Sequence, residues 1–141
     1  MKFEGKWRIN SCLRLDDERG MVYLSLDELE ALDPEGGDAA EMKGYLIDIQ
    51  PDGFILTSIP VPEGASAEDI AGAKAMGREF IDGDTRLVLG RAPWREEEDG
   101  TVKFDSGVRG ETLGEPVDPW APLEETEDGL LQYLMYRLER V

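Results

Sequence analysis

The chain has 141 residues, 40% of them hydrophobic and 33% charged, a composition typical of a single folded globular domain over residues 1–141. The formal net charge is −17, and the 15 Lys and Arg residues form no cluster. This charge argues against a nucleic-acid partner and against an anionic membrane surface. The single cysteine, Cys12, excludes an intramolecular disulfide and any metal site built from several thiolates.

Residues 2–15 predict a long β-strand with one solvent-exposed face, because mainly apolar and mainly polar side chains alternate along it. One face carries Phe3, Gly5, Trp7, Ile9, Ser11, Leu13 and Leu15. The other face carries Lys2, Glu4, Lys6, Arg8, Asn10, Cys12 and Arg14. We interpret Cys12 as a small apolar residue, although the neighbouring Arg14 would favour its thiolate. A turn at 16–20 follows this strand.

Residues 21–24 read as a short strand, and Ser25 with Glu28 forms a capping box that opens a short helix. Leu26, Leu29 and Leu32 are expected on its inner side. Residues 43–50 and 54–61 predict a hairpin around the turn "QPDG". Asp48 is expected to face outward from its first strand. A second helix, loosely packed, is predicted from Ser66 to Gly77.

Short strands are expected at 78–82, 84–92 and 101–106, followed by a loop-like stretch at 107–129. The final segment, "GLLQYLMYRLERV", fits a helical stripe as well as a strand. Its aromatic residues and the preceding "EDG" turn favour the strand. Acidic residues gather in the turns 95–100 and 123–129, which indicates a solvated surface.

Many short strands between a long first and a long last strand predict a closed antiparallel sheet, so the fold class is mostly β, an up-and-down barrel with one or two short helices. If the first and last strands pair, Trp7 lies opposite 136–140. Arg140 is then expected to lie across the Trp7 indole, a cation–π contact of roughly 0.5–2 kcal/mol. Gly5 would allow a close approach there. Trp7 therefore indicates barrel closure more strongly than ligand binding.

The pattern Phe3-x-Gly5-x-Trp7, with Arg140 near the other end, resembles the calycin superfamily of lipocalins and fatty-acid-binding proteins. The resemblance covers about 20 residues at the two ends of the chain. It implies a barrel whose interior holds a small lipophilic or amphipathic ligand. The Arg-x-Tyr carboxylate clamp of the intracellular fatty-acid-binding proteins is not reproduced, since the last strand reads Tyr136-Arg137-Leu138-Glu139-Arg140.

Our first hypothesis is a non-enzymatic protein that binds such a ligand inside the barrel. The candidate ligand-binding residues are Trp7, Tyr45, Phe54, Phe104, Tyr136 and Arg140. A large void in the barrel would favour this hypothesis. The second hypothesis is a packed interaction module with contact loops around Trp94 and Trp120 that binds a protein partner or a second copy. It would be favoured if the side chains expected to face inward meet at the barrel centre; these are Ile9, Leu13, Ile47, Phe54, Leu87 and Phe104.

Catalysis by carboxylates is a third hypothesis. The chain has no histidine, which removes the commonest general base and metal ligand. No phosphate-binding glycine loop and no calcium loop is present. We therefore expect no cofactor, no metal and no catalytic residue. Without a membrane-length apolar run or a leader-like segment, we expect a cytoplasmic location and no membrane insertion.

Overall fold

The computed structural model describes residues 1–108, 110–112 and 114–141. Three short helices accompany the strands: α1 Leu26–Leu32, α2 Asp38–Lys43 and α3 Ala67–Ala75. The first strands are β1 Gly5–Asp16, β2 Gly20–Ser25, β3 Leu46–Ile49, β4 Phe54–Pro60, β5 Phe80–Ile81 and β6 Arg86–Glu96. The later strands are β7 Val102–Asp105, β8 Glu111–Thr112, β9 Glu115–Pro116, β10 Trp120–Pro122, β11 Glu124–Glu125, β12 Leu131–Tyr133 and β13 Tyr136–Arg140.

The strands form a nearly closed antiparallel barrel of nine strands, in the order β10-β7-β6-β4-β3-β1-β13-β12-β11. Leaving aside β2 and β5, which pair at the side with β1 and β6, neighbours on this path follow one another along the chain except at two places, where β1 pairs with β13 and β7 pairs with β10. β10 and β11 stand at the two ends of the path and are separated only by Leu123. The Leu123 amide donates to the carbonyl of Val102, at 2.8 Å. One continuous segment thus pairs with β7 through its first half and with β12 through its second.

β1 pairs with β13 as expected, and Trp7 lies opposite Arg140 in the register. The register shifts between Ile9 and Ser11, where β1 carries a bulge. A bulge adds one residue to a strand and reverses the facing of those that follow. Cys12 is therefore fully buried, whereas Leu15 is 73% exposed, which corrects the continuous alternation expected along this strand.

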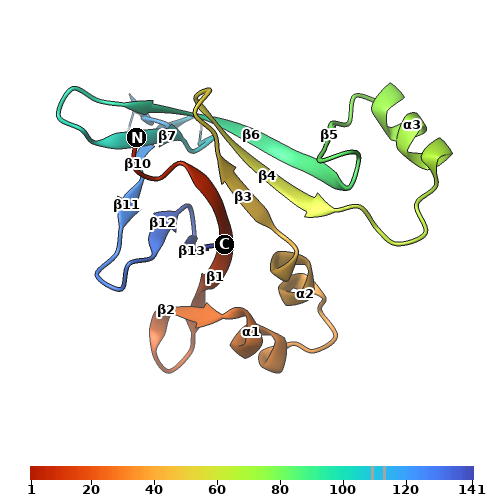
Figure 1. Cartoon of the computed structure of the whole chain (residues 1–141). Helices are drawn as coiled ribbons and strands as arrows, with labels where there is room; N and C mark the ends of the chain where they lie inside the picture. The colour runs from red at the N-terminus through yellow and green to blue at the C-terminus, as the bar shows by residue number, and fades with distance from the viewer. Residues whose placement is uncertain (109, 113) are drawn as a thin grey trace.

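The helices α1 and α2 lie together at one end of the barrel (Figure 1). Ser25 and Glu28 form the expected capping box of α1, in which the Ser25 hydroxyl accepts from the Glu28 amide at 3.2 Å. Helix α2 was not expected, and it delays the start of the following strand from residue 43 to Leu46. Leu29 and Met42 are buried between these helices and the strands, whereas Leu32 is exposed, contrary to expectation.

Helix α3 stands away from the barrel, at the far end of β4 and β5 (Figure 1). None of its residues is buried, and Met76 at its end is 87% exposed. Its Ala- and Gly-rich sequence explains this position, because small side chains bury little apolar surface. The loose packing expected for this helix is confirmed.

The final segment forms a hairpin of β12 and β13 and no helix. Its two-residue turn, Leu134 and Met135, was not expected, and Leu134 has a φ of 54°. The stretch 107–129, expected as a loop, contains β8 to β11. Arg109 and Leu113, which belong to that expectation, lie outside the described residues.

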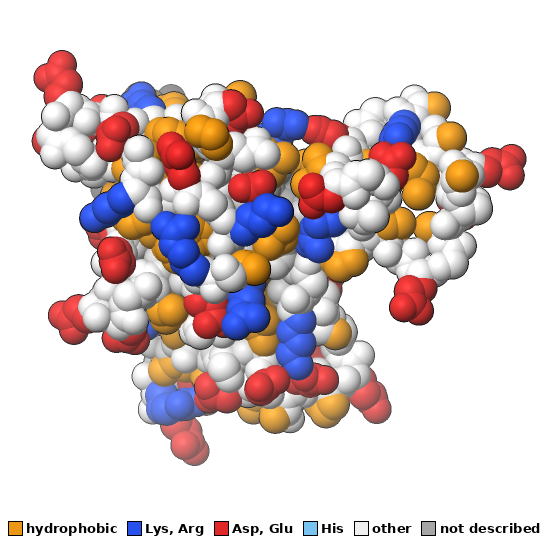
Figure 2. Space-filling view, in the orientation of Figure 1, with side chains coloured by type: hydrophobic (Ala, Val, Ile, Leu, Met, Phe, Trp, Pro, Cys, Tyr) orange, Lys and Arg blue, Asp and Glu red, His pale blue; other side chains and the backbone are white. Residues whose placement is uncertain are grey.

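Acidic side chains are spread along the outline of the face shown in Figure 2, and Lys and Arg side chains lie nearer its middle. Several Lys and Arg residues form exposed ion pairs, such as Arg8 with Glu139 and Lys74 with Asp84. Exposed pairs of this kind contribute roughly 0–1 kcal/mol each. These paired charges therefore belong to a solvated surface.

Candidate functional site

Trp7 and Arg140 contact each other across β1 and β13, the two strands whose pairing closes the barrel. The guanidinium carbon of Arg140 lies 4.4 Å from the centroid of the Trp7 ring. Arg140 also donates to the carbonyls of Glu4, at 2.8 Å, and Lys2, at 2.9 Å. The Trp7 indole donates to the carbonyl of Phe3 at 2.8 Å. The two side chains therefore contact each other and nearby backbone carbonyls, as parts of the barrel structure itself.

Phe104 and Phe54 lie in different environments. Phe104 is buried in the core, and its ring centroid is 4.7 Å from that of Tyr133. Phe54 is partly exposed at the start of β4, with the Arg91 guanidinium 5.9 Å from its ring centroid. The structure thus separates Phe54 from the core residues among the candidate ligand contacts.

The interior of the barrel is filled by its own side chains. A single cluster of buried residues includes Ile9 from β1, Ile47 from β3 and Phe104 from β7, which were expected to face inward. Of the other inward positions, Leu13 and Leu87 are half-buried. Five pockets among the described residues are lined by other side chains, and neither Ile47 nor Phe104 lines any of these five.

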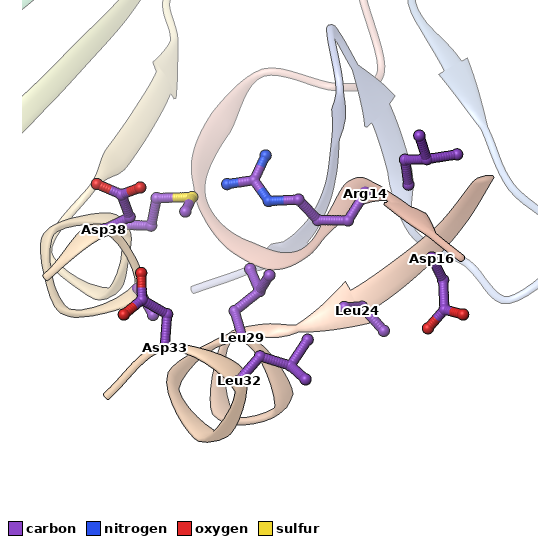
Figure 3. Close-up of a pocket in the computed structure, with 10 residues that line it drawn as sticks. Arg14, Asp16, Leu24, Leu29, Leu32, Asp33 and Asp38 are labelled. Carbon is purple, nitrogen blue, oxygen red and sulfur yellow. The ribbon is translucent and has the colours of Figure 1, made fainter. Parts of the chain in front are cut away.

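A pocket of about 200 Å³ opens between helices α1 and α2 and the end of β1 at residues 14–16. We call it the helix pocket. Its apolar lining is Leu15, Leu24, Leu29, Leu32, Ala39 and Met42. Its charged lining is Arg14, Asp16, Asp33 and Asp38. Figure 3 shows the leucines of α1 and β2 on one side and Arg14 reaching across toward α2.

Arg14 is the notable polar group of the helix pocket. Its side chain is half-buried, and it makes no hydrogen bond or ion pair with any described residue. Most other arginines of the described chain are engaged: Arg86, for example, donates to Ser58 Oγ at 2.8 Å and to the Gly44 carbonyl at 2.7 Å. A guanidinium that points into an apolar pocket without a partner offers hydrogen-bond donors to a bound molecule.

A second pocket, of about 180 Å³, lies beside the first, and we call it the tyrosine pocket. It is lined by Cys12, Arg14, Asp38, Glu41, Met42, Tyr45, Met135 and Tyr136. Arg14, Asp38 and Met42 line both pockets, so the two are neighbours. Tyr45 and Tyr136 are the candidate ligand contacts that the structure brings together.

In the tyrosine pocket, the pKa values of Tyr136 and Tyr45 are both raised, which favours the neutral phenols. Burial raises the pKa of Tyr136, and the nearby Cys12 and Tyr45 raise it further, while Arg14 acts in the opposite direction. Burial also raises the pKa of Tyr45, with smaller contributions from Glu41 and Asp38. Both hydroxyls therefore keep their protons at neutral pH and can donate a hydrogen bond.

Cys12 is buried with its pKa raised by that burial, against a smaller effect of Arg14. Its environment favours the thiol, which agrees with the interpretation of Cys12 as a small apolar residue. Asp48 lies on the side of β3 opposite the buried Ile47 and Ile49, and its register neighbours are Lys6 and Leu56. It faces outward, as expected.

Sequence reasoning missed Arg14, Asp38 and Met42 as site residues. Arg14 was placed on an outer face because the bulge at 9–11 was not foreseen. Asp38 and Met42 belong to α2, which was not predicted. The spacing of Ala39 and Met42, three residues apart and followed by Gly44, is a signal that could have indicated this short helix.

Trp94 and Trp120 lie in β6 and β10 and not in loops, which corrects that expectation. Both are half-buried. The Trp94 indole donates to the carbonyl of Gln50 at 2.8 Å, and the Arg95 guanidinium carbon lies 4.1 Å from the Trp120 ring centroid. Each of the two side chains therefore contacts a neighbouring residue of the barrel.

In the described part of the chain, no group of three or more His, Cys, Asp and Glu side chains is arranged to hold a metal ion. Within the same residues, no helix has the length and apolarity needed to cross a membrane. Comparison with protein-family models gives no match, and neither curated proteins nor solved structures match the chain.

Proposed function

We propose that the protein binds a small amphipathic molecule in the helix pocket, with its apolar part against Leu29 and Met42 and an oxygen atom accepting hydrogen bonds from Arg14. The observation that carries the proposal is the unpartnered Arg14 guanidinium beside an apolar lining. Ligand sites commonly combine an apolar wall with a few convergent polar groups. The pocket volume of about 200 Å³ lies below the usual range of roughly 300–1,000 Å³, which favours a small ligand.

Membership of the calycin superfamily is part of this proposal. It is supported by the contact of Arg140 with Trp7 and by the strand order of the barrel. That resemblance implies a ligand at the barrel centre, where this chain has packed side chains. We therefore assign the ligand to the end of the barrel that α1 and α2 cover.

The proposal can be tested by NMR of methyl-labelled methionine, because the chain has only 5 Met residues. Met42 lines both pockets, whereas Met76 on α3 is exposed far from them. Titration with isocaproamide, a short branched amide with a carbonyl oxygen, should shift the Met42 methyl signal and leave that of Met76 unchanged. No shift at Met42 would contradict the proposal.

The role of Arg14 is tested by Arg14→Gln, with Arg8→Gln as the matched control. Arg8 lies on the same strand but forms an exposed ion pair with Glu139, away from the helix pocket. Arg14→Gln should weaken isocaproamide binding roughly tenfold, the usual order for loss of a charge-assisted hydrogen bond. Arg8→Gln should leave it unchanged. Equal effects of the two substitutions would remove Arg14 from the proposed site.

Native mass spectrometry of freshly purified protein offers an independent test. A small-molecule adduct that is lost on denaturation would support the proposal, and its mass would indicate the class of ligand. A dimer without an adduct would instead favour the alternative, an interaction module that associates with itself.

A further inference from the structure

The helix pocket contains more negative than positive charge. Arg14 is its only cation, and three aspartates line it, with Glu41 next to them in the tyrosine pocket. Asp16 is already engaged, because its carboxylate accepts from the amides of two neighbouring residues and from the Arg19 guanidinium. Asp33 and Asp38 form no ion pair with any described residue.

The nearby lysine does not neutralise these carboxylates. Lys43, at the end of α2, forms ion pairs with Asp27 at 3.1 Å and with Glu30 at 2.5 Å, both on α1. Arg14 reaches toward α2 but makes no ion pair with Asp38, which lines both pockets with it (Figure 3). Two charged groups of opposite sign thus stand at one apolar pocket, each without a partner in the described residues.

The field of Asp38 extends into the tyrosine pocket, since Asp38 contributes to the raised pKa of Tyr45. The net charge of −17 acts in the same direction over longer distances. Such a charge attracts cations to the protein and repels anions, and the effect weakens with salt. A carboxylate ligand would be attracted by Arg14 but repelled by the surrounding aspartates.

We propose that the ligand of the helix pocket carries an ammonium group that pairs with Asp38, in addition to the oxygen that accepts from Arg14. This inference rests on the proposed function and names its ligand class: small apolar amines that also carry a carbonyl oxygen, as in an amide of an apolar amino acid. The opposite charges at the pocket then each receive a partner when the ligand binds.

Three probes of one shape separate the possibilities. Leucinamide carries an ammonium group and a carbonyl oxygen, isocaproamide is the same molecule without the amino group, and isocaproate carries a carboxylate. The affinities are measured from the Met42 methyl signal in weakly acidic buffer, where the leucinamide amine is protonated. We expect leucinamide to bind roughly tenfold more tightly than isocaproamide, and isocaproate to bind most weakly.

Asp38→Asn tests the partner of the ammonium group, with Asp128→Asn as a control that changes the net charge equally. Asp38 and Asp128 are both exposed, so neither substitution disturbs the core. Asp38→Asn should remove most of the leucinamide advantage and leave isocaproamide binding unchanged. Asp128→Asn should preserve the advantage.

The outcomes distinguish this inference from the proposed function. Equal affinity for leucinamide and isocaproamide, or tightest binding of isocaproate, would overturn the ammonium inference and leave the helix pocket as a binding site. An equal effect of Asp38→Asn and Asp128→Asn would likewise overturn the assignment to Asp38. Failure of all three probes to shift Met42 would overturn the proposed function together with it.

Discussion

Arg140 and Trp7 join the first and last barrel strands, with 4.4 Å between the guanidinium carbon and the indole centroid. The same guanidinium donates two hydrogen bonds to backbone carbonyls that precede β1. One side chain therefore fixes both the pairing of the two strands and the path of the residues that lead into the barrel.

Arg140→Ala should lower the free energy of unfolding by roughly 1–3 kcal/mol, since it removes a cation–π contact and two charge-assisted hydrogen bonds. Urea denaturation followed by tryptophan fluorescence measures the change. Arg8→Ala, which removes only an exposed ion pair between the same two strands, should cost less than about 1 kcal/mol. Equal losses would show that the contacts of Arg140 add nothing to an ordinary surface pair.

Gly5→Ala should destabilise the protein by roughly 1–3 kcal/mol. Gly5 has a φ of 127°, and a Cβ atom there would lie 2.7 Å from Nη1 of Arg140. The same substitution at Gly72, in the exposed helix α3, meets no atom within 4 Å and should stabilise by roughly 0.5–1 kcal/mol. Thermal unfolding of both variants checks the opposite signs, and a stabilised Gly5→Ala would contradict the close approach.

Tyr133 should make stability depend on alkaline pH. Burial raises its pKa to about 12, while a hydrogen bond with Thr57 acts in the opposite direction. Relative to an unfolded pKa of about 10, the shift corresponds to roughly 3 kcal/mol. The folded state favours the neutral phenol, so this stability is complete below about pH 10 and is lost as the pH rises toward 12.

The difference in unfolding free energy between the wild type and Tyr133→Phe isolates this effect, because all other titrating groups are shared. We expect the wild type to lose stability relative to the variant above about pH 10. Urea unfolding in a series of alkaline buffers measures it. A difference that does not vary with pH would contradict the raised pKa.

Cys12 should resist alkylation in the folded protein, because the thiol is buried and its pKa is raised. Iodoacetamide should modify it at least about 100-fold more slowly than in urea-unfolded protein, a rate limited by opening of the structure. The matched control is Leu15→Cys in a Cys12→Ser background, since Leu15 is exposed on the same strand. Similar rates for the two cysteines in the folded state would refute the burial of Cys12.

Barrel closure was predictable from sequence because it depends on residues whose chemistry is specific. The alternation around Trp7, the small Gly5 and the cation at Arg140 each indicated one part of the same contact, and the observed register agrees. The hairpin of β3 and β4 was predictable for a similar reason, since "QPDG" is a strong turn signal.

The helix pocket was not predictable to the same degree, because it depends on two small departures from regular structure. The bulge after Ile9 brings Cys12 inside and reverses the facing of the following residues, and a single added residue leaves no pattern in this sequence. The six-residue helix α2 leaves only the spacing of Ala39 and Met42 before Gly44 as a signal, which is weak because it covers a single helical turn. The turn at Leu134 uses a positive φ that sequence rules assign to glycine or asparagine.

The pairing of β1 with β13 also has a consequence for folding during synthesis. The ribosome produces β1 long before β13, so the edge of β1 at residues 7–12 has no strand to cover it until the other barrel strands have emerged. An uncovered strand edge is a site of intermolecular pairing. Contacts between such distant segments also slow folding, because the loop between them must close first. The nascent chain therefore carries an aggregation-prone edge until β13 has left the ribosome and can pair with β1.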